Sequence, residues 1–188
     1  MTKNKNFIYF IRHAESLYVE GAERSRGLTD NGKLDAIVVK ELLINEGIDL
    51  FYSSPYSRTI NTIMVLANEL SKEIIIEEDL REREIGDFSK CHFKEAKRKV
   101  YEDFRFSFTN GESSEQAQRR AVKVVEKILE EHDDKRIVIG THGDIMSLML
   151  NYFDKNYGFS FWESTSMPDI YQLYFEGLEL KRVIRLWK

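Results

Sequence analysis

The stretch FIYFIRHAES, residues 7–16, decides the fold that we expect for this chain. Its first five residues, 7–11, form a continuous apolar and aromatic run, which is typical of a strand buried on both faces in a parallel sheet. Arg12 and His13 follow directly. Because ligands of open α/β sheets bind beyond the carboxyl ends of the strands, these two side chains stand where functional groups are expected.

Alternating strand and helix patterns follow this first strand. The sequence predicts three more strands, at residues 48–52, 73–77 and 136–140, the last apolar throughout. It predicts helices that begin at Thr29, at Ser54 or Pro55, at Ser113 and at Asp144. Residues 82–111 are predicted to hold loops and one or two short helices, and residues 170–175 and 178–187 a hairpin. These patterns predict an α/β fold, a three-layer α/β/α sandwich with a mostly parallel central sheet and an antiparallel C-terminal edge strand.

Two helices carry patterns that predict which face is buried. In the helix after Thr29, apolar residues recur at helical spacing and predict a buried stripe formed by Leu34, Ile37, Val38, Leu42 and, less regularly, Leu43. A second stretch is rich in basic residues interleaved with glutamates. We interpret it as a solvated helix face; its cations are Lys94, Lys97, Arg98 and Lys99.

The composition is that of a globular chain. It has 188 residues, 42% hydrophobic and 32% charged, which predicts one domain over residues 1–188. The net charge of -4 argues against nucleic acid as the main partner. Cys91 is the sole cysteine, so no intrachain disulfide forms and a reducing compartment is expected. No apolar run is long enough for a signal peptide or a membrane span, and we expect a cytoplasmic protein without membrane partners.

Polar side chains follow three of the predicted strands. Arg12 and His13 follow the first strand, residues 53–58 follow the second, and residues 141–143 follow the fourth. Taken one at a time, each of these side chains is more often structural than catalytic. Three strand ends that bring arginine or histidine to one edge of a sheet, however, predict a functional site.

The candidate site combines two histidines, two arginines and a carboxylate: His13, His142, Arg12, Arg58 and Glu82. A metal site is one possibility, but the arginines would repel a cation and no HxH or HExxH spacing supports it. Anion binding fits better, because a guanidinium group forms bidentate hydrogen bonds with phosphate oxygens and stays charged. A neutral imidazole attacks phosphorus, and a carboxylic acid protonates the leaving alkoxide.

Six short motifs occur in order along the chain. They are Arg12-His13-Ala14, Leu28-Thr29-Asp30-Asn31-Gly32, Ser53-Ser54-Pro55 with Arg58, Leu80-Arg81-Glu82 with Gly86, Gly111-Glu112-Ser113, and Thr141-His142-Gly143. Together they resemble the histidine phosphatase superfamily, also called the phosphoglycerate mutase-like or RHG family, in its phosphatase branch. The resemblance covers most of the chain.

The resemblance implies a role for each residue of the site. His13 would be phosphorylated to a phosphohistidine that water then hydrolyses. Glu82 would donate the proton to the leaving group, in preference to the nearby Glu84 and Asp87. His142 would be the third catalytic residue, and the phosphate would be held by Arg12, Arg58, Ser16 and Gly143. No metal ion and no organic cofactor are implied.

Three positions depart from the family's usual pattern. Ala14 stands in place of the glycine after the histidine, which is tolerated where the backbone has a negative φ. Asp35 replaces a common glutamine. Val19 stands where many members carry a phosphate-contacting asparagine. The segment from residue 20 to 26, with Arg24 and Arg26, is a candidate substitute.

Three functions remain open from the sequence. We expect a phosphomonoester hydrolase, a histidine acid-type phosphatase, that acts on a small phosphorylated metabolite. A mutase-type phosphotransferase is an alternative, but the stretch between Gly86 and Asn110 is short for one. A non-catalytic phosphate-binding module is a third reading. Selectivity is expected from segments 20–27, 88–108 and 157–169, whose aromatic residues we interpret as local core packing. The protein is expected to be a monomer or homodimer.

Overall fold

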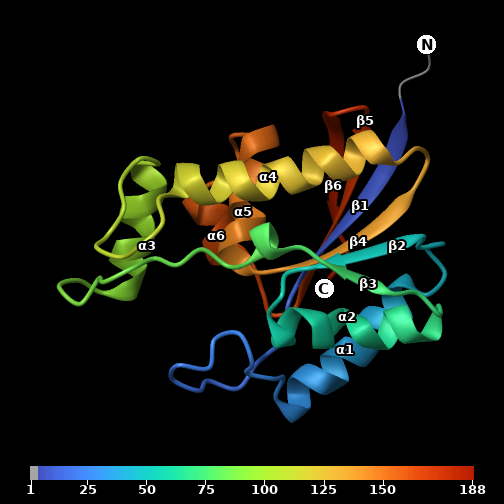
Figure 1. The fold of residues 1–188 in the computed structure, drawn as a ribbon, viewed down its shortest axis with the longest axis horizontal. Helices are drawn as coiled ribbons and strands as arrows, with labels where there is room; N and C mark the ends of the chain where they lie inside the picture. The colour runs from blue at the N-terminus through green and yellow to red at the C-terminus, as the bar shows by residue number, and fades with distance from the viewer. Residues whose placement is uncertain (1–3) are drawn as a thin grey trace.

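A six-stranded sheet forms the centre of the protein, with strands in the order β3-β2-β4-β1-β5-β6 (Figure 1). The structure is a computed structural model and describes residues 4–188. The strands are β1 (Lys5–Arg12), β2 (Leu50–Ser53), β3 (Ile74–Ile76), β4 (Arg136–Thr141), β5 (Asp169–Glu176) and β6 (Glu179–Arg185). Strands β3, β2, β4 and β1 are parallel, whereas β5 is antiparallel to β1 and β6 to β5. The predicted fold class is therefore confirmed.

Helices cover both faces of the sheet. They are α1 (Asp30–Leu43), α2 (Ser57–Glu69), α3 (Phe93–Glu102), α4 (Ser114–Glu131), α5 (Gly143–Phe153) and α6 (Phe159–Ser164), with a 3₁₀ turn η1 (Glu78–Leu80). Figure 1 shows α1 and α2 on one side and α4 and α5 on the other. In β1, Ile8 and Phe10 face the core under α4 and α5, and Tyr9 and Ile11 face the core under α1 and α2. Within residues 4–188, no helix is both long and apolar enough to span a membrane.

The predicted buried stripe of α1 is wrong except at Leu43, which is buried. Leu34 is 62% exposed, and Ile37, Val38 and Leu42 are exposed as well. The buried face is formed by Gly32, Ala36, Val39 and Leu43. Gly32 shows the reason, since a Cβ at this position would lie 2.1 Å from the carbonyl oxygen of Glu15. The helix packs through its smallest residues because the chain after β1 approaches it closely.

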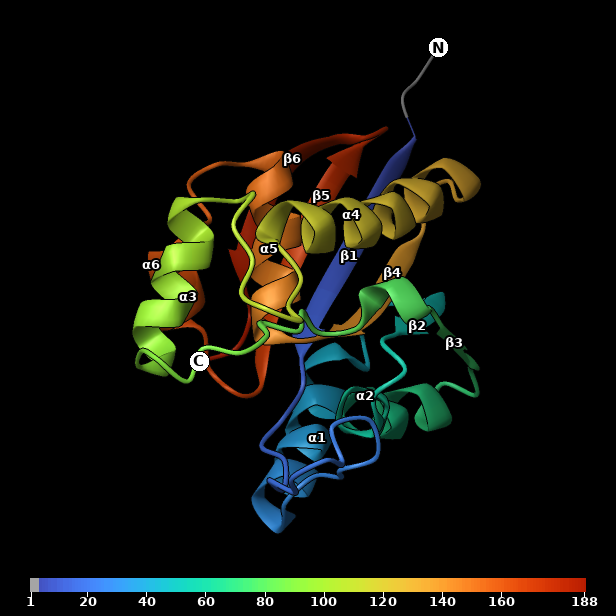
Figure 2. The ribbon, with the colours of Figure 1, turned by 60° about the vertical axis from the view of Figure 1, so that its left-hand side comes forward.

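Helix boundaries also differ from the prediction at three places. Helix α2 begins at Ser57 with Tyr56 as N-cap. Ser54 does not cap the helix, because its hydroxyl bonds His142, which directly follows β4. Helix α5 begins at Gly143, one residue before the predicted start. Helix α6 was not predicted; Figure 2 shows it beside α3, where Phe93 and Trp162 pack edge to face.

Helix α3 corrects the prediction of a solvated basic face. Lys97 is 5% exposed and forms an ion pair with Asp144 of α5, whereas Lys94, Arg98 and Lys99 are exposed. Most of the aromatic residues around this helix behave as predicted and pack against the core under α4 and α5, whereas Phe93 is 49% exposed. Those that pack include Phe104, Phe106, Phe108, Tyr157, Phe159, Phe161 and Trp162.

Candidate active site

The carboxyl ends of β1, β4 and β2 lie side by side and bring the predicted residues together. The backbone N–H of His13 donates to Thr141 O at 3.0 Å, and that of Ser54 donates to Gly140 O at 3.0 Å. The rings of His13 and His142 are 5.4 Å apart between centroids, at an interplanar angle of 67°. The parallel register therefore places both histidines in one cluster.

His13 is held as a neutral imidazole with one nitrogen free. Its Nδ1 is 2.8 Å from the carbonyl oxygen of Ala14, which can only accept, so Nδ1 carries the proton and Nε2 keeps its lone pair. The ring is 6% exposed. Burial lowers the pKa of His13 to about 3, and the charges of Arg58 and Arg12 act in the same direction. An unprotonated Nε2 is the form that attacks an electrophile.

Ala14 replaces the family's usual glycine without strain. It is not among the described residues with positive φ, it is fully buried, and its N–H donates to Thr62 Oγ1 at 2.9 Å. The expectation that alanine is tolerated at this position is therefore confirmed.

His142 lies behind His13 and is fully buried. Its Nε2 is 2.7 Å from Ser54 Oγ, and its Nδ1 has no hydrogen-bond partner within the described chain. Tyr56 packs edge-on against the ring, with centroids 4.9 Å apart. Burial lowers the pKa of His142, and the neighbouring His13 and Arg58 lower it further. The two histidines are thus both neutral when the site is empty.

Arg12 lies over the start of α5. A Cβ on Gly143 would be 2.7 Å from Arg12 Cζ, so the glycine leaves the space that the guanidinium fills. Nη1 of Arg12 donates to Thr165 O at 3.2 Å and to Thr165 Oγ1 at 2.7 Å. Its Nε is buried and has no hydrogen-bond partner among residues 4–188. The arginine is fixed at one end and retains an unused donor at the other.

Arg58 occupies the first turn of α2 and is 2% exposed. Its Nη1 donates to Glu23 O at 2.6 Å, and its guanidinium stacks on Tyr56 at 4.8 Å from the ring centroid. Its Nε also has no hydrogen-bond partner in the described chain. A cation is disfavoured here both by its burial and by the positive end of the helix dipole, and an anion as its partner would offset both effects.

Glu82 reaches the same cluster from the segment after η1. Its carboxylate accepts N–H bonds from Arg83 at 2.9 Å, Ile145 at 2.9 Å and Asp144 at 3.2 Å. The carboxylate therefore caps the N-terminus of α5, next to His142. The alternatives Glu84 and Asp87 are both exposed and line the cavity that Glu82 lines, and Asp87 accepts the N–H of Ser89, which lowers the pKa of Asp87.

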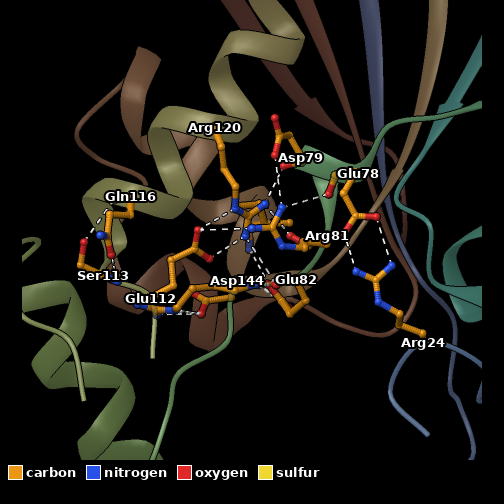
Figure 3. A network of polar contacts seen from close by, with 12 residues as sticks. Arg24, Glu78, Asp79, Arg81, Glu82, Glu112, Ser113, Gln116, Arg120 and Asp144 are labelled. Carbon is orange, nitrogen blue, oxygen red and sulfur yellow. Dashed lines mark hydrogen bonds and ion pairs between the residues drawn. The ribbon is translucent and has the colours of Figure 1, made fainter. Parts of the chain in front are cut away.

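A bidentate ion pair holds the segment that carries Glu82 (Figure 3). Arg120 of α4 binds both carboxylate oxygens of Glu112 at 2.7 Å. Its Nη1 also donates to Asp79 O at 2.6 Å and to Arg81 O at 2.9 Å. Glu112 of the Gly-Glu-Ser motif therefore orients the arginine that fixes the backbone just before Glu82.

A buried ionic cluster lies beneath Glu82. Asp144 accepts from Arg83 Nε at 2.7 Å, from Tyr101 Oη at 2.8 Å and from Lys97. All four side chains are at least 92% buried. Burial opposes ionisation of Asp144, but the charges of Lys97 and Arg83 outweigh it, and the pKa of Asp144 falls to about 2. The cluster ties α3 and the Glu82 segment to the start of α5.

Ser16, predicted to bind phosphate, accepts a hydrogen bond from Arg26 Nη1. The loop from 16 to 28 folds back so that Ser16 and Leu28 form an isolated antiparallel bridge. Val19 lies in this loop, 48% exposed, and its apolar side chain offers no hydrogen bond. The polar contact near Ser16 is therefore made by Arg26.

A cavity of about 560 Å³ opens beside the cluster. Its lining includes Glu82, Tyr56, Glu23, Arg24 and Glu84. Of the predicted selectivity segments, only 20–27 contributes to it, through Glu23 and Arg24. No group of three or more His, Cys, Asp or Glu side chains within residues 4–188 is arranged to hold a metal ion.

Sequence reasoning missed several residues that shape the site. Thr165 holds Arg12, Tyr56 packs on His142, and Glu23 contacts Arg58. All three lie in segments singled out from the sequence, but none of them was assigned a role of its own. Asp144 follows the Thr-His-Gly motif directly, and Lys97 lies in the basic stretch. Their opposite charges and apolar neighbours are a signal of burial, but nothing in the sequence pairs them.

The fold and the cluster define a class of protein: an α/β enzyme with a phosphate-sized anion site at the carboxyl ends of its parallel strands. Residues 8–176 match the histidine phosphatase superfamily (branch 1). Phosphoglycerate mutase-like protein 4 of Arabidopsis thaliana is 31% identical over 156 residues, 74% of this chain and 67% of that protein. Phosphoserine phosphatase 1 of Hydrogenobacter thermophilus is 30% identical over 148 residues, 72% of this chain and 70% of that protein.

The solved structure of a mycobacterial glucosyl-3-phosphoglycerate phosphatase has the same fold. It superposes with a TM-score of 0.76 at 18% identity and covers 96% of this chain and 97% of its own. This chain belongs to the histidine phosphatase superfamily (branch 1). It is a phosphatase of that superfamily.

Proposed function

We propose that hydrolysis proceeds through a phosphohistidine on Nε2 of His13. The supporting observation is the Nδ1 contact to Ala14 O at 2.8 Å, which leaves Nε2 unprotonated beside the arginines. Nε2 attacks phosphorus, and the bond from phosphorus to the ester oxygen breaks. Water then attacks the phosphohistidine, releases inorganic phosphate and regenerates the imidazole.

Each neighbouring side chain takes one part of this reaction. Glu82 protonates the leaving alkoxide and later takes a proton from the attacking water. Arg12 and Arg58 hold the phosphoryl oxygens, and their unused Nε donors support that role. His142 donates to the phosphoryl group where negative charge develops. Ser16 and Gly143 complete the phosphate pocket, Gly143 by leaving space for the Arg12 guanidinium.

Hydrolysis is favoured over a mutase reaction because little of the chain is available to shield a phosphohistidine from water. Between Gly86 and Asn110 the chain forms α3 and two short loops. The substrate is a small metabolite that enters the cavity beside Glu82. Phosphoserine is the first candidate, since relatives are named phosphoserine phosphatases.

We further propose a single catalytic domain that needs neither a metal ion nor an organic cofactor. It works in the cytoplasm as a monomer or homodimer, and neither nucleic acid nor a membrane is a partner. The positive charges of Arg12, Arg26 and Arg58 support a reaction without a metal ion, because they disfavour a bound cation. Undiminished turnover after dialysis against a chelator is the expected result, and loss of activity that metal restores would contradict it.

Trapping the intermediate tests the mechanism. Brief incubation with a ³²P-labelled phosphomonoester, followed by alkaline quench, should leave an acid-labile label on the wild-type protein. His13→Ala should lose both the label and phosphate release while keeping its unfolding transition. Activity that survives in His13→Ala would sink the mechanism. If the wild-type protein binds phosphate but releases none from a panel of phosphorylated metabolites, the result would instead support a non-catalytic module. If it isomerises phosphoglycerate, the result would support a mutase.

A further inference from the structure

The loop between β1 and α1 returns to the active site at its far end. Leu17 N–H donates to Gly27 O at 2.9 Å, next to the bridge between Ser16 and Leu28. The loop is also attached to α2, because Ser57 N–H donates to Arg24 O at 2.8 Å. Two anchors therefore hold the end of this loop beside the strand that carries His13.

Arg26 uses its donors on two sides: one side bonds Ser16 and Leu17, and the other faces the Glu23 carboxylate. Nη1 donates to Ser16 Oγ and, at 3.2 Å, to Leu17 O. The opposite edge of the guanidinium, Nε and Nη2, points to Glu23 Oε2, with both nitrogens 3.4 Å from that oxygen. The side chain of Arg26 is 14% exposed. One edge is thus fixed by the chain, and the other edge, the one suited to bidentate binding, faces a carboxylate.

The same carboxylate oxygen also faces the phosphate-binding arginine of α2. Glu23 Oε2 is 3.4 Å from Nη1 of Arg58. Both contacts are longer than the 2.7–2.9 Å that is usual for charge-assisted hydrogen bonds. The side chain of Glu23 is 55% exposed. A carboxylate held this loosely moves into solvent at small cost.

The charge of Arg26 reaches the reacting groups. It lowers the pKa of His13 and of His142, and after burial it is the largest influence that lowers the pKa of Arg58. Arg24, its neighbour in the loop, is different: it is exposed and paired with Glu78 (Figure 3). Of these two arginines, only Arg26 belongs to the cluster.

We propose that Arg26 is a third arginine of the phosphate pocket and that the Glu23 carboxylate occupies its Nε–Nη2 edge until a phosphate ester displaces it. The proposal rests on the proposed function, because it concerns the same phosphate site. A dianionic phosphate has more charge and more acceptor oxygens than Glu23, so it wins the two arginines when it binds. Glu23 swings toward solvent and stays on the chain, ready to return after phosphate leaves.

Two substitutions with opposite expected effects test this arrangement. Isothermal titration with inorganic phosphate measures the pocket without turnover. Arg26→Gln should weaken phosphate binding by about 10- to 100-fold, the size expected for losing a charged hydrogen-bonding pair. Glu23→Gln should tighten it by a few fold, since a competing anion is removed. In the double variant the gain from Glu23→Gln should shrink, because of the two arginines for which the anions compete only Arg58 remains.

A matched control separates binding from general loss of charge or of structure. Arg119→Gln removes an arginine whose side chain is 68% exposed on α4, and it should leave phosphate binding unchanged. Arg26→Lys keeps the charge but lacks the fork, so it should recover only part of the affinity. The unfolding midpoint of each ligand-free variant shows whether the fold is intact. In turnover, Arg26→Gln should raise KM more than it lowers kcat.

The outcomes separate the proposal from the function on which it rests. Phosphate affinity within twofold of wild type in a folded Arg26→Gln would overturn the proposal, as would weaker binding in Glu23→Gln. A wild-type protein that binds phosphate through Arg26 but hydrolyses no ester would overturn the proposed function while leaving the role of Arg26 in place.

Discussion

Replacing Asp144 with asparagine removes the one carboxylate that two buried cations share. Arg83 is 3% exposed and Lys97 5%, and both bind Oδ2 of Asp144. An asparagine keeps the shape but brings no charge, so two cations would remain in the core without a counterion. The backbone N–H of residue 144 also holds Glu82, at 3.2 Å. The substitution therefore tests both stability and the placement of the general acid.

The expected loss of stability is about 3–5 kcal/mol, the range for removing one partner of a buried ion pair. The lowered pKa of Asp144 points in the same direction. A carboxyl whose pKa falls from 3.8 to about 2 on folding contributes about 2 kcal/mol at neutral pH. Because the folded pKa is the lower one, this contribution is present above about pH 4 and disappears as the pH falls toward 2.

Urea unfolding at pH 7 and at pH 3 measures these quantities. Asp144→Asn should lower the free energy of unfolding at pH 7 by about 3 kcal/mol or more, and the difference from wild type should shrink at pH 3. Adding Lys97→Met should recover part of the loss, because one unpaired cation is removed. Asp30→Asn is the matched control, since the side chain of Asp30 is 97% exposed and its pair with Lys33 is worth at most about 1 kcal/mol.

Two results would refute this reasoning. A loss below about 1 kcal/mol in Asp144→Asn would show that the cluster is not the buried counterion system described above. A loss in Lys97→Met as large as that in Asp144→Asn would show that Lys97 is needed even while Asp144 keeps Arg83 as its partner, so Asp144 is not the shared counterion that sets the stability. kcat should fall with Asp144→Asn if the start of α5 shifts, since Glu82 is bonded to it.

Three further predictions concern the active site. His13 should stay neutral at pH values far below its usual pKa, because burial and the nearby arginines lower the pKa of His13 to about 3. Its imidazole NMR shifts should be constant from about pH 8 to 5, and a titration near pH 6.5 would contradict this prediction. Glu112→Gln weakens the bidentate pair behind Glu82 and should lower kcat by about tenfold or more, with a smaller change in KM; an unchanged kcat would show that the pair does not position the acid. Gly143→Ala puts a Cβ 2.7 Å from Arg12 Cζ and should weaken phosphate binding by about tenfold or more in the same titration, whereas wild-type affinity would show that Arg12 adapts.

Much of the fold follows from local sequence. The run at residues 7–11 is buried on both faces, and this is visible because its apolar character is continuous rather than alternating. The cap at Ser113 is also local, since its hydroxyl accepts from the backbone N–H of Gln116 and the Gln116 side chain returns the bond. Such signals depend on neighbours three or four residues away, and a sequence shows them directly.

The face that a helix buries does not follow in the same way. In α1 the bulkier stripe with Leu34 and Val38 is exposed, and the stripe with Gly32 and Ala36 is buried. Hydrophobicity ranks leucine above glycine, but the 2.1 Å approach of Glu15 O to a Cβ at position 32 allows only glycine there. The close approach of the chain at Glu15 decided which face of α1 is buried. The spacing of apolar residues within the helix does not show that approach.

The sequence alone determined most of the strands and helices in their order along the chain, helix α6 excepted. It also brought His13 and His142 together, because side chains that follow parallel strands must meet at one edge of the sheet, and the motifs added Glu82. Only the tertiary structure decided how the site is supported, as by the contacts of Lys97 with Asp144 and of Arg58 with Glu23. These pairs join separate segments, and the burial that turns a surface charge into a partner exists only after the chain has packed.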